Sequence, residues 1–263
     1  MNPMSEIDPR AVVSPSAKLG KSVRIGPYAV VGDEVELGDG CLLDAHSVIK
    51  GPSTFGRDNH FYSFSIVGGD PQDLTYTGQR VRLEAGDENE FHEFCTVHRG
   101  TIKGGGVTRL GNHNLIMAYA HIGHDCMIGN RTVLINGAQL AGHIIVEDYA
   151  TISSFCLLHQ FSRVGRHSYI GAGTIITQDV PPFSKVVSSR DTRCFGINKV
   201  GLERQGFSPE RIKTIEQAYR LLLRSKLNTT QAVEKMRGTL SDSEDVQTLI
   251  RFIESVADRG LTK

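Results

Sequence analysis

The sequence predicts a mainly β chain that forms a parallel β-helix, followed by a small α-helical domain. Three observations predict it: aliphatic residues recur every six positions, small residues recur four positions after them, and the repeat stops near a proline pair, Pro181-Pro182. The same spacing runs from Ile7 to Val67 and through Ala85, Phe91 and Val97 in an earlier phase. The strictest stretch comprises Leu110, Ile116, Ile122, Ile128, Leu134, Leu140, Val146, Ile152, Leu158, Val164, Ile170 and Ile176.

Each six-residue repeat predicts one short strand and one corner. The small residue lies two positions before the next aliphatic residue, so both point to one face of a strand. A glycine often follows the aliphatic residue and suits the turn. Strands this short bury a face only by stacking coil on coil. The small positions are Ala11, Ala17, Ala29, Ser47, Ala120, Ala138, Ala150 and Thr174, and four cysteines also occupy them: Cys41, Cys95, Cys126 and Cys156.

Known proteins with hexapeptide repeats wind three repeats per coil into a three-sided, left-handed prism. By analogy with them, we expect a left-handed parallel β-helix with an 18-residue coil over residues 1–190. The handedness comes from that analogy, because parallel crossovers are otherwise right-handed.

Two stretches interrupt the repeat. Residues 68–80 (GGDPQDLTYTGQR) keep its phase but lack aliphatic residues at positions 73 and 79, and residues 98–109 (HRGTIKGGGVTR) shift the phase by one. Both predict loops that leave the prism. Binding residues are often found on such loops.

Residues 191–263 predict a small helical domain. We expect the proline pair to end regular strand pairing. Ser208 and Pro209 then suit the N-cap and first turn of a helix, and a weaker helix is expected over Thr229–Arg237. Ser241 and Glu244 form a capping-box pattern for a last helix, with Gly260 as its expected stop.

Composition excludes several classes of protein. The 263 residues contain 29 Lys and Arg against 29 Asp and Glu, so no overall basic charge favours nucleic acid or an anionic membrane. Five cysteines without metal-type spacing indicate reduced thiols. The sequence has no signal-peptide pattern and no apolar run of about 18 residues. We therefore expect a cytoplasmic protein without stable membrane insertion.

The histidines indicate a candidate site. All ten fall outside the two inward positions of the repeat. Four of them lie within three residues of the column formed by Ile122, Leu140 and Leu158, with coils about 5 Å apart. They are His121, His124, His143 and His159.

Two kinds of chemistry remain open for this cluster. Neutral imidazoles either bind a metal, as in the carbonic anhydrases built on the same repeat, or take a proton from a hydroxyl group. Gly142 lies one coil from His124, and its N–H could stabilise an oxyanion. It could equally be an ordinary turn glycine.

The sequence as a whole resembles a known family, the acyl-carrier-protein-dependent UDP-N-acetylglucosamine O-acyltransferases of lipid A synthesis. The resemblance covers essentially the entire chain. It is carried by HRGTIKGGG (98–106), AHIGHDC (120–126), LAGH (140–143), HQF (159–161), QDVPP (178–182) and FGIN (195–198), followed by GLERQGFS.

The resemblance implies a function and its residues. His124 would be the general base, Asp125 would orient it, and Gly142 would supply the oxyanion donor. It implies a homotrimer with the site between prisms, a 3-hydroxyacyl donor on the phosphopantetheine of acyl carrier protein, and no metal or other cofactor. The implied substrate-binding residues are Gln72, Asp73, His98, His121, His143, His159 and Gln160, with Asn198 and Arg204 at the nucleotide and Tyr169 and Ala172 setting acyl length.

Three departures from the family pattern concern the acceptor. Thr75 replaces a lysine, while Val200 and Gln205 replace charged residues near the nucleotide. A related acceptor, such as a 3-amino sugar analogue, therefore stays possible.

Residues 198–226 carry seven Lys or Arg against three Asp or Glu. This excess of positive charge suits either docking of acidic acyl carrier protein or an ordinary solvated helix face.

Three other functions are considered. A zinc hydratase of the hexapeptide type would use His121, His124 and His143 as ligands. The N-acyltransferase that acts later in the pathway carries an N-terminal uridine-binding domain, whereas these repeats begin at Ile7. A scaffold without catalytic activity is the third.

Overall fold

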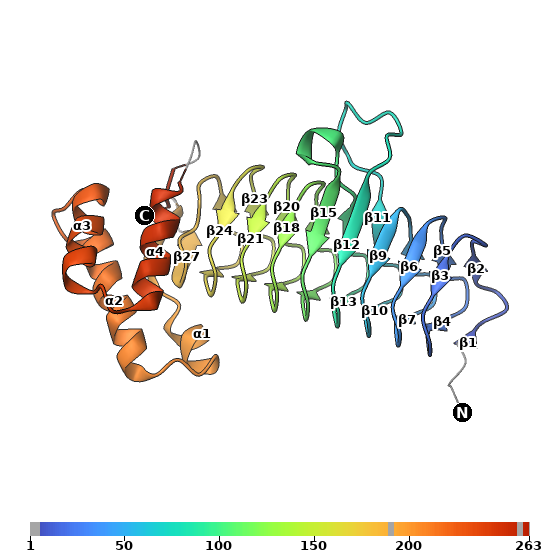
Figure 1. Ribbon diagram of the computed structural model, residues 1–263, viewed down its shortest axis with the longest axis horizontal. Helices are drawn as coiled ribbons and strands as arrows, with labels where there is room; N and C mark the ends of the chain where they lie inside the picture. Colours follow the sequence, from blue (N-terminus) through green and yellow to red (C-terminus); the bar gives the residue numbers. More distant parts are fainter. Residues whose placement is uncertain (1–5, 189–191, 257–259, 263) are drawn as a thin grey trace.

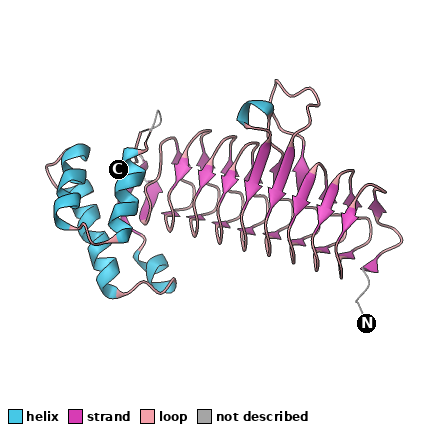
Figure 2. Ribbon diagram, viewed as in Figure 1, coloured by secondary structure: helices cyan, strands magenta, loops and turns pink. Residues whose placement is uncertain are grey.

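The chain folds into a three-sided prism with a group of helices at one end (Figure 1, Figure 2). The computed structural model describes residues 6–188, 192–256 and 260–262. The expected domain boundary at residue 190 lies outside these residues. Three parallel sheets form the sides of the prism, and they are named A, B and C here.

The strands of the three sheets alternate along the chain. Sheet A contains β1 (Glu6–Ile7), β4 (Arg24–Ile25), β7 (Leu42–Leu43), β10 (His60–Phe61), β13 (Glu90–Phe91), β16 (Leu115–Ile116), β19 (Val133–Leu134), β22 (Thr151–Ile152), β25 (Tyr169–Ile170), β27 (Ser184–Ser188) and β28 (Thr192–Ile197). Sheet B contains β2 (Val12–Val13), β5 (Val30–Val31), β8 (Val48–Ile49), β11 (Ile66–Gly69), β14 (Thr96–His98), β17 (His121–Ile122), β20 (Gln139–Leu140), β23 (Leu157–Leu158) and β26 (Ile175–Ile176). Sheet C contains β3 (Lys18–Leu19), β6 (Val35–Leu37), β9 (Ser53–Phe55), β12 (Arg82–Ala85), β15 (Val107–Leu110), β18 (Met127–Ile128), β21 (Ile145–Val146) and β24 (Arg163–Val164).

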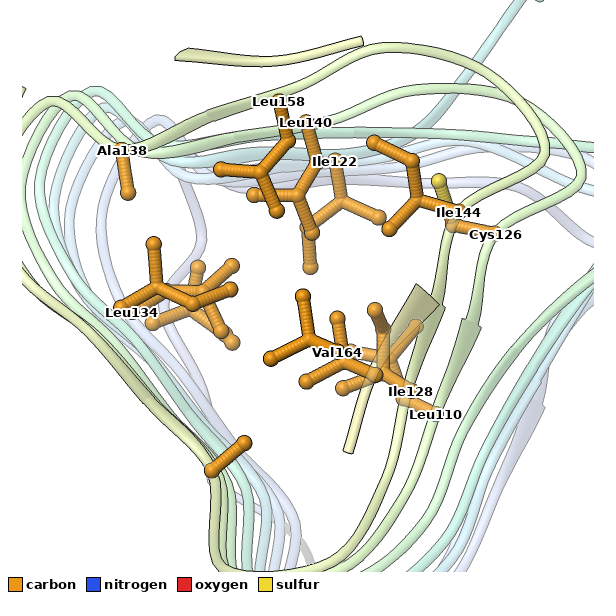
Figure 3. Close-up of a cluster of buried hydrophobic side chains, with 14 of the residues drawn as sticks. Leu110, Ile122, Cys126, Ile128, Leu134, Ala138, Leu140, Ile144, Leu158 and Val164 are labelled. Atoms are coloured by element: carbon orange, nitrogen blue, oxygen red, sulfur yellow. The ribbon is translucent and has the colours of Figure 1, made fainter. Parts of the chain in front are cut away.

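The strand register confirms the 18-residue coil. His121 pairs with Gln139, and Ile122 pairs with Leu140. All twelve aliphatic residues from Leu110 to Ile176 are buried, and Figure 3 shows part of the columns that they form on the inner faces, for example Ile122, Leu140 and Leu158. The four cysteines at the small inward positions are fully buried as well. The core is thus the one that the six-residue spacing predicts.

Both interruptions of the repeat are loops that leave the prism. His60 pairs with Leu42 on one side and with Glu90 on the other, so the first loop adds twelve residues to its coil. Thr96 pairs with His121, so the second loop adds seven. The second includes a short 3-10 helix, η1 (Ile102–Gly104). The two loops protrude beside each other from one edge (Figure 1), and Arg99 of one forms an ion pair with Asp70 of the other.

The end of the prism differs from the expectation. The proline pair does not end the pairing, because β27 still pairs in parallel with β25 before β28 turns antiparallel onto it. The carbonyl of Pro182 accepts a hydrogen bond from the buried Tyr219 hydroxyl instead. The coil at the prolines is therefore two residues shorter than the 18-residue coil, and Pro182 helps to attach the helices.

Four helices follow in the described part of the chain. They are α1 (Lys199–Arg204), α2 (Pro209–Arg224), α3 (Thr229–Thr239) and α4 (Glu244–Glu254). Ser208 caps α2 as predicted, and α3 confirms the weaker helix. The prediction for α4 was wrong at both ends. Ser243, not Ser241, caps it, because its side chain reaches the N–H of Val246, and it ends at Glu254 rather than near Gly260. The carbonyl of Gly260 instead accepts a hydrogen bond from the N–H of Asp179.

No helix among the described residues is both long enough and apolar enough to span a lipid bilayer.

Candidate active site

His124 and Asp125 form a hydrogen-bonded pair at the corner between sheets B and C. The Nδ1 atom of His124 lies 2.8 Å from Oδ2 of Asp125, and their side chains are 13% and 1% exposed. A carboxylate only accepts, so Nδ1 carries the proton and donates it. The Nε2 atom of His124 then keeps its lone pair, which is the form that a general base requires.

The carboxyl of Asp125 is held in its charged form. Its burial would raise the pKa, but hydrogen bonds from His124 and from the side chain and N–H of Thr101, together with the nearby His143, bring the pKa below its ordinary value. A buried carboxylate needs such donors to remain ionised. Asp125 therefore accepts the hydrogen bond of His124 as a carboxylate.

Gly142 lies directly against the imidazole of His124. A Cβ atom on Gly142 would stand 2.5 to 2.9 Å from three atoms of that ring, closer than any side chain tolerates. Within the described chain the Gly142 N–H has no acceptor, whereas the corner amides of Asn112 and Asn130 donate to side chains of the next coil. The register thus predicted the contact between His124 and Gly142 correctly. The Gly142 N–H is thus an amide without an acceptor among the residues described, one coil from His124.

His143 completes this cluster. Its ring centroid lies 5.1 Å from that of His124, edge to face, and its Nε2 lies 3.6 Å from Oδ2 of Asp125. Burial lowers its pKa, although the charge of Asp125 works in the opposite direction. The ring of Phe161 stacks on His143 with centroids 4.5 Å apart. Sequence reasoning missed Phe161, although the 18-residue register places it one coil above His143.

His98 and His121 form a second pair instead of extending the first. Their ring centroids are 4.9 Å apart, and Nδ1 of His121 lies 2.8 Å from the hydroxyl of Thr96. Burial lowers the pKa of both rings, to about 4 for His98. The Nδ1 atom of His98 is buried and has no partner among the described residues. Its hydrogen-bonding capacity is therefore unsatisfied in this structure.

His159 stands apart from the other histidines. It is exposed, and its Nδ1 faces the carbonyl of the neighbouring Gln160, which is also exposed. No ring contact or hydrogen bond joins it to the other histidines in the described structure. The predicted single row of four imidazoles therefore divides into separate groups, because neighbouring corner positions point in different directions.

Two histidines that face outward in the repeat are nevertheless buried. They are His98 and His167. His167 stacks on the rings of both Tyr149 and Phe183 and meets the ring of Phe207 nearly edge to face. An outward position in the repeat therefore does not mean exposure. The contribution of Phe207, which precedes α2, could not be read from the repeat.

We expect the stability of the fold to decrease as the pH falls from about 6.5 towards 4. Burial lowers the pKa of both His98 and His167 from 6.5 to about 4, so in this range the unfolded chain binds more protons than the folded chain. Their contribution is complete above pH 6.5 and is lost on acidification. Urea midpoints measured across this range test this. His167→Phe keeps the ring stack on Tyr149, and we expect it to make the stability depend less steeply on pH. If the pH dependence were the same as in the wild type, His167 would not be buried in its neutral form.

The first loop places Asp73 near this cluster. Hydrogen bonds from the side chain and N–H of Thr75 lower the pKa of Asp73, with smaller contributions from the charges of Lys103 and His124. Gln72 beside it is exposed. Thr75 thus orients Asp73, a role that the sequence comparison with the family pattern did not suggest.

A second group of predicted residues lines a pocket of about 530 Å³ on sheet A. Asn198, Arg204 and Tyr169 line it together with Lys185 and the rings of Tyr149 and His167. Val200 and Gln205, the two departures, line it as well. Ala172 is exposed and does not line it. The side chain of Asn198 also caps α1 and donates to the carbonyl of His167.

The set of residues that could hold a metal differs from the predicted one. In the described part of the chain it is His124, Asp125 and His143, whose ligand atoms lie within 4.8 Å of one another. His121 is not part of it, because its ring faces His98 and Thr96. Both oxygens of Asp125 already accept hydrogen bonds from Thr101. Oδ2 also accepts the hydrogen bond of His124 Nδ1, so a cation held between those two atoms would displace that bond.

Comparison with known proteins establishes the family. The hexapeptide model of bacterial transferases (six repeats) matches residues 16–51 and 107–142, and the model for domain 2 of UDP-N-acetylglucosamine O-acyltransferase matches residues 179–262. The acyl-[acyl-carrier-protein]–UDP-N-acetylglucosamine O-acyltransferase of Halorhodospira halophila is 46% identical over 260 residues, which is 99% of this chain and 100% of that protein. The protein of the same name from Alkalilimnicola ehrlichii is 44% identical over 260 residues, with the same coverage. The chain belongs to the UDP-N-acetylglucosamine O-acyltransferase family.

A solved structure agrees with this assignment. The UDP-N-acetylglucosamine acyltransferase of Francisella novicida superposes with a TM-score of 0.94 at 38% identity, covering 97% of this chain and 93% of that one. The left-handed parallel β-helix of hexapeptide repeats and the family resemblance are thereby confirmed. As a member of the UDP-N-acetylglucosamine O-acyltransferase family, the chain is an enzyme.

Proposed function

We propose that the chain transfers a 3-hydroxyacyl group from acyl carrier protein to the 3-hydroxyl of UDP-N-acetylglucosamine, the first step of lipid A synthesis. The names of its relatives support the substrates. The observation that carries the chemistry is the His124–Asp125 pair lying against Gly142, which is a base with its orienting carboxylate beside a free amide.

The geometry supports a single acyl transfer without a covalent enzyme intermediate. The Nε2 atom of His124 takes the proton of the sugar hydroxyl as its oxygen attacks the thioester carbonyl. The N–H of Gly142 donates to the oxyanion that forms. Collapse of this intermediate breaks the carbon–sulfur bond, and the phosphopantetheine thiolate leaves with the proton held by His124. The ester product and the free thiol account for all atoms.

The other predicted residues bind the substrates in this proposal. Asp73, His98, His121 and His143 lie near the base, and Gln72 adjoins Asp73 in the chain. His159 and Gln160 lie farther along the same edge. Asn198 and Arg204 contact the nucleotide, and Tyr169 with Ala172 limits the acyl chain. The unpartnered Nδ1 of His98 and the lowered pKa of Asp73 support these roles.

We propose further that the enzyme works as a homotrimer in the cytoplasm. The base lies at the corner between sheets B and C, while the pocket of Asn198 and Arg204 lies on sheet A. A neighbouring prism that brings its own pocket to this corner would join them. Five buried free cysteines suit a reducing compartment.

The acceptor is the part of the proposal with a specific alternative. Val200 is 57% exposed at the pocket, where it offers no charge or hydrogen bond to a nucleotide sugar. A 3-amino analogue of the sugar, giving an amide, is therefore the second acceptor to be tested.

The test uses purified full-length protein with 3-hydroxyacyl carrier proteins of several chain lengths. Each is combined with UDP-N-acetylglucosamine and with its 3-amino analogue. We expect an ester of the first acceptor, formed equally well after dialysis against a chelator. If only the amine is acylated, the acceptor is the analogue. No transfer to either acceptor would refute the proposal. Stoichiometric zinc in the purified protein would favour the zinc hydratase.

A further inference from the structure

The second loop encloses the carboxylate of Asp125. The N–H of Thr101 donates to Oδ1 at 2.7 Å, and the hydroxyl of Thr101 donates to Oδ2 at 2.7 Å. The N–H of Asp125 donates in turn to the hydroxyl of Thr108 at 2.8 Å. All three residues are buried, Thr108 completely. One residue of the loop thus contacts both oxygens of the carboxylate that orients the base.

The hydroxyl of Thr101 has its direction determined by its neighbours. Because an ionised carboxylate only accepts, the hydroxyl proton points towards Asp125. Its oxygen accepts the N–H of Gly104 at 3.3 Å, as the N-cap of η1. A hydroxyl that accepts a hydrogen bond becomes a better donor. The short helix η1 therefore holds and polarises the hydroxyl that binds Asp125.

Gly104 closes the loop over the same carboxylate. A Cβ atom on Gly104 would stand 2.0 to 2.5 Å from the carboxyl atoms of Asp125. The backbone of η1 thus packs directly on the carboxyl group. Asp125 itself adopts a φ of 61°, the left-handed conformation that recurs at the corners of this prism, for example at Tyr119 and His143. The hydrogen bonds and the close packing of the loop hold the carboxylate in one orientation.

We propose that Thr101 is a positioning residue for catalysis. By holding both oxygens of Asp125, it keeps Oδ2 in line with Nδ1 of His124 and so fixes the tautomer and the orientation of the base over Gly142. The loop at 98–109 then serves the base as well as the substrate. This inference rests on the proposed function, because it assumes that His124 is the base.

The first experiment tests whether the hydroxyl of Thr101, and not the shape of its side chain, supports catalysis. Thr101→Val removes the hydroxyl and keeps the shape, and we expect kcat to fall roughly 10- to 100-fold with KM for both substrates within about threefold. Thr101→Ser keeps the hydroxyl and should retain most of kcat. Thr132→Val is the matched control, since the buried Thr132 hydroxyl donates to Asn114 at 2.8 Å in another corner. It should lower the thermal midpoint but leave kcat unaltered.

The second experiment asks whether Thr101 acts through Asp125. Asparagine tolerates the left-handed conformation of position 125, so Asp125→Asn should fold. In that variant we expect Thr101→Val to have less than about a threefold further effect on kcat, because the two losses share one mechanism. Multiplied losses, or a Thr101→Val enzyme with wild-type kcat, would overturn the inference. A wild type that transfers no acyl group would instead refute the proposed function.

Discussion

Replacing His124 with alanine is expected to lower kcat by about 10³-fold or more, with little effect on KM for the nucleotide sugar. The reason is that Nε2 of His124 is the proton acceptor, while the other groups around the acceptor sugar stay in place. The side chain is only 13% exposed, so water does not readily replace it at the same position. Initial rates with saturating acyl carrier protein measure the effect.

His113→Ala is a suitable control for this variant. His113 lies at a different corner of the prism, where its Nδ1 is 3.2 Å from Glu88, and it has no part in the cluster. Its rate should stay within about twofold of wild type, as for other surface changes. A His124→Ala enzyme that kept a tenth of the wild-type kcat would show that another group takes the proton.

Replacing Gly142 with alanine is expected to lower kcat by roughly 10²- to 10³-fold. The added Cβ would stand 2.5 Å from the nearest atom of the His124 ring, so the imidazole must swing away from the amide beneath it. One methyl group thus displaces the base and obstructs the oxyanion donor. Steady-state kinetics and circular dichroism together distinguish this from misfolding.

Gly32→Ala provides the comparison within the same repeat. Gly32 directly follows the aliphatic Val31, whereas Gly142 lies two positions after Leu140. A Cβ on Gly32 would meet no atom closer than 3.3 Å. We expect normal kcat from it. If Gly142→Ala were also fully active, the amide of Gly142 would have no catalytic role, and the oxyanion donor would have to be sought elsewhere.

The prism could be predicted in detail because its core repeats. The spacing of aliphatic residues determines which side chains point inward, and the 18-residue coil follows once three sides are assumed. It also predicted that His124 and Gly142 would meet. The ends of α4 were less predictable, since Ser241 and Ser243 both precede acidic residues and only packing selects the second.

Much of the site could not be predicted, because it lies where the repeat is broken. The contact of Thr101 with Asp125 spans a loop whose seven extra residues follow no register. The burial of His167 depends on Phe207 from the helical domain. Periodicity relates residues on successive coils only, so contacts made by loops and helices need the three-dimensional structure.

Because Gly142 lies one coil beyond His124, the coils of the prism fix the spacing of these two residues, whereas the loops form the contacts with the substrates. The backbones of His124 and Gly142 belong to neighbouring coils, so their separation is about the 4.8 Å spacing of paired strands, and hydrogen bonds along the whole prism maintain it. Loops that vary in length, sequence or partner can therefore alter what is bound without altering that distance. The spacing of the coils thus keeps the reacting groups in place, while changes in the loops can alter which substrate is bound.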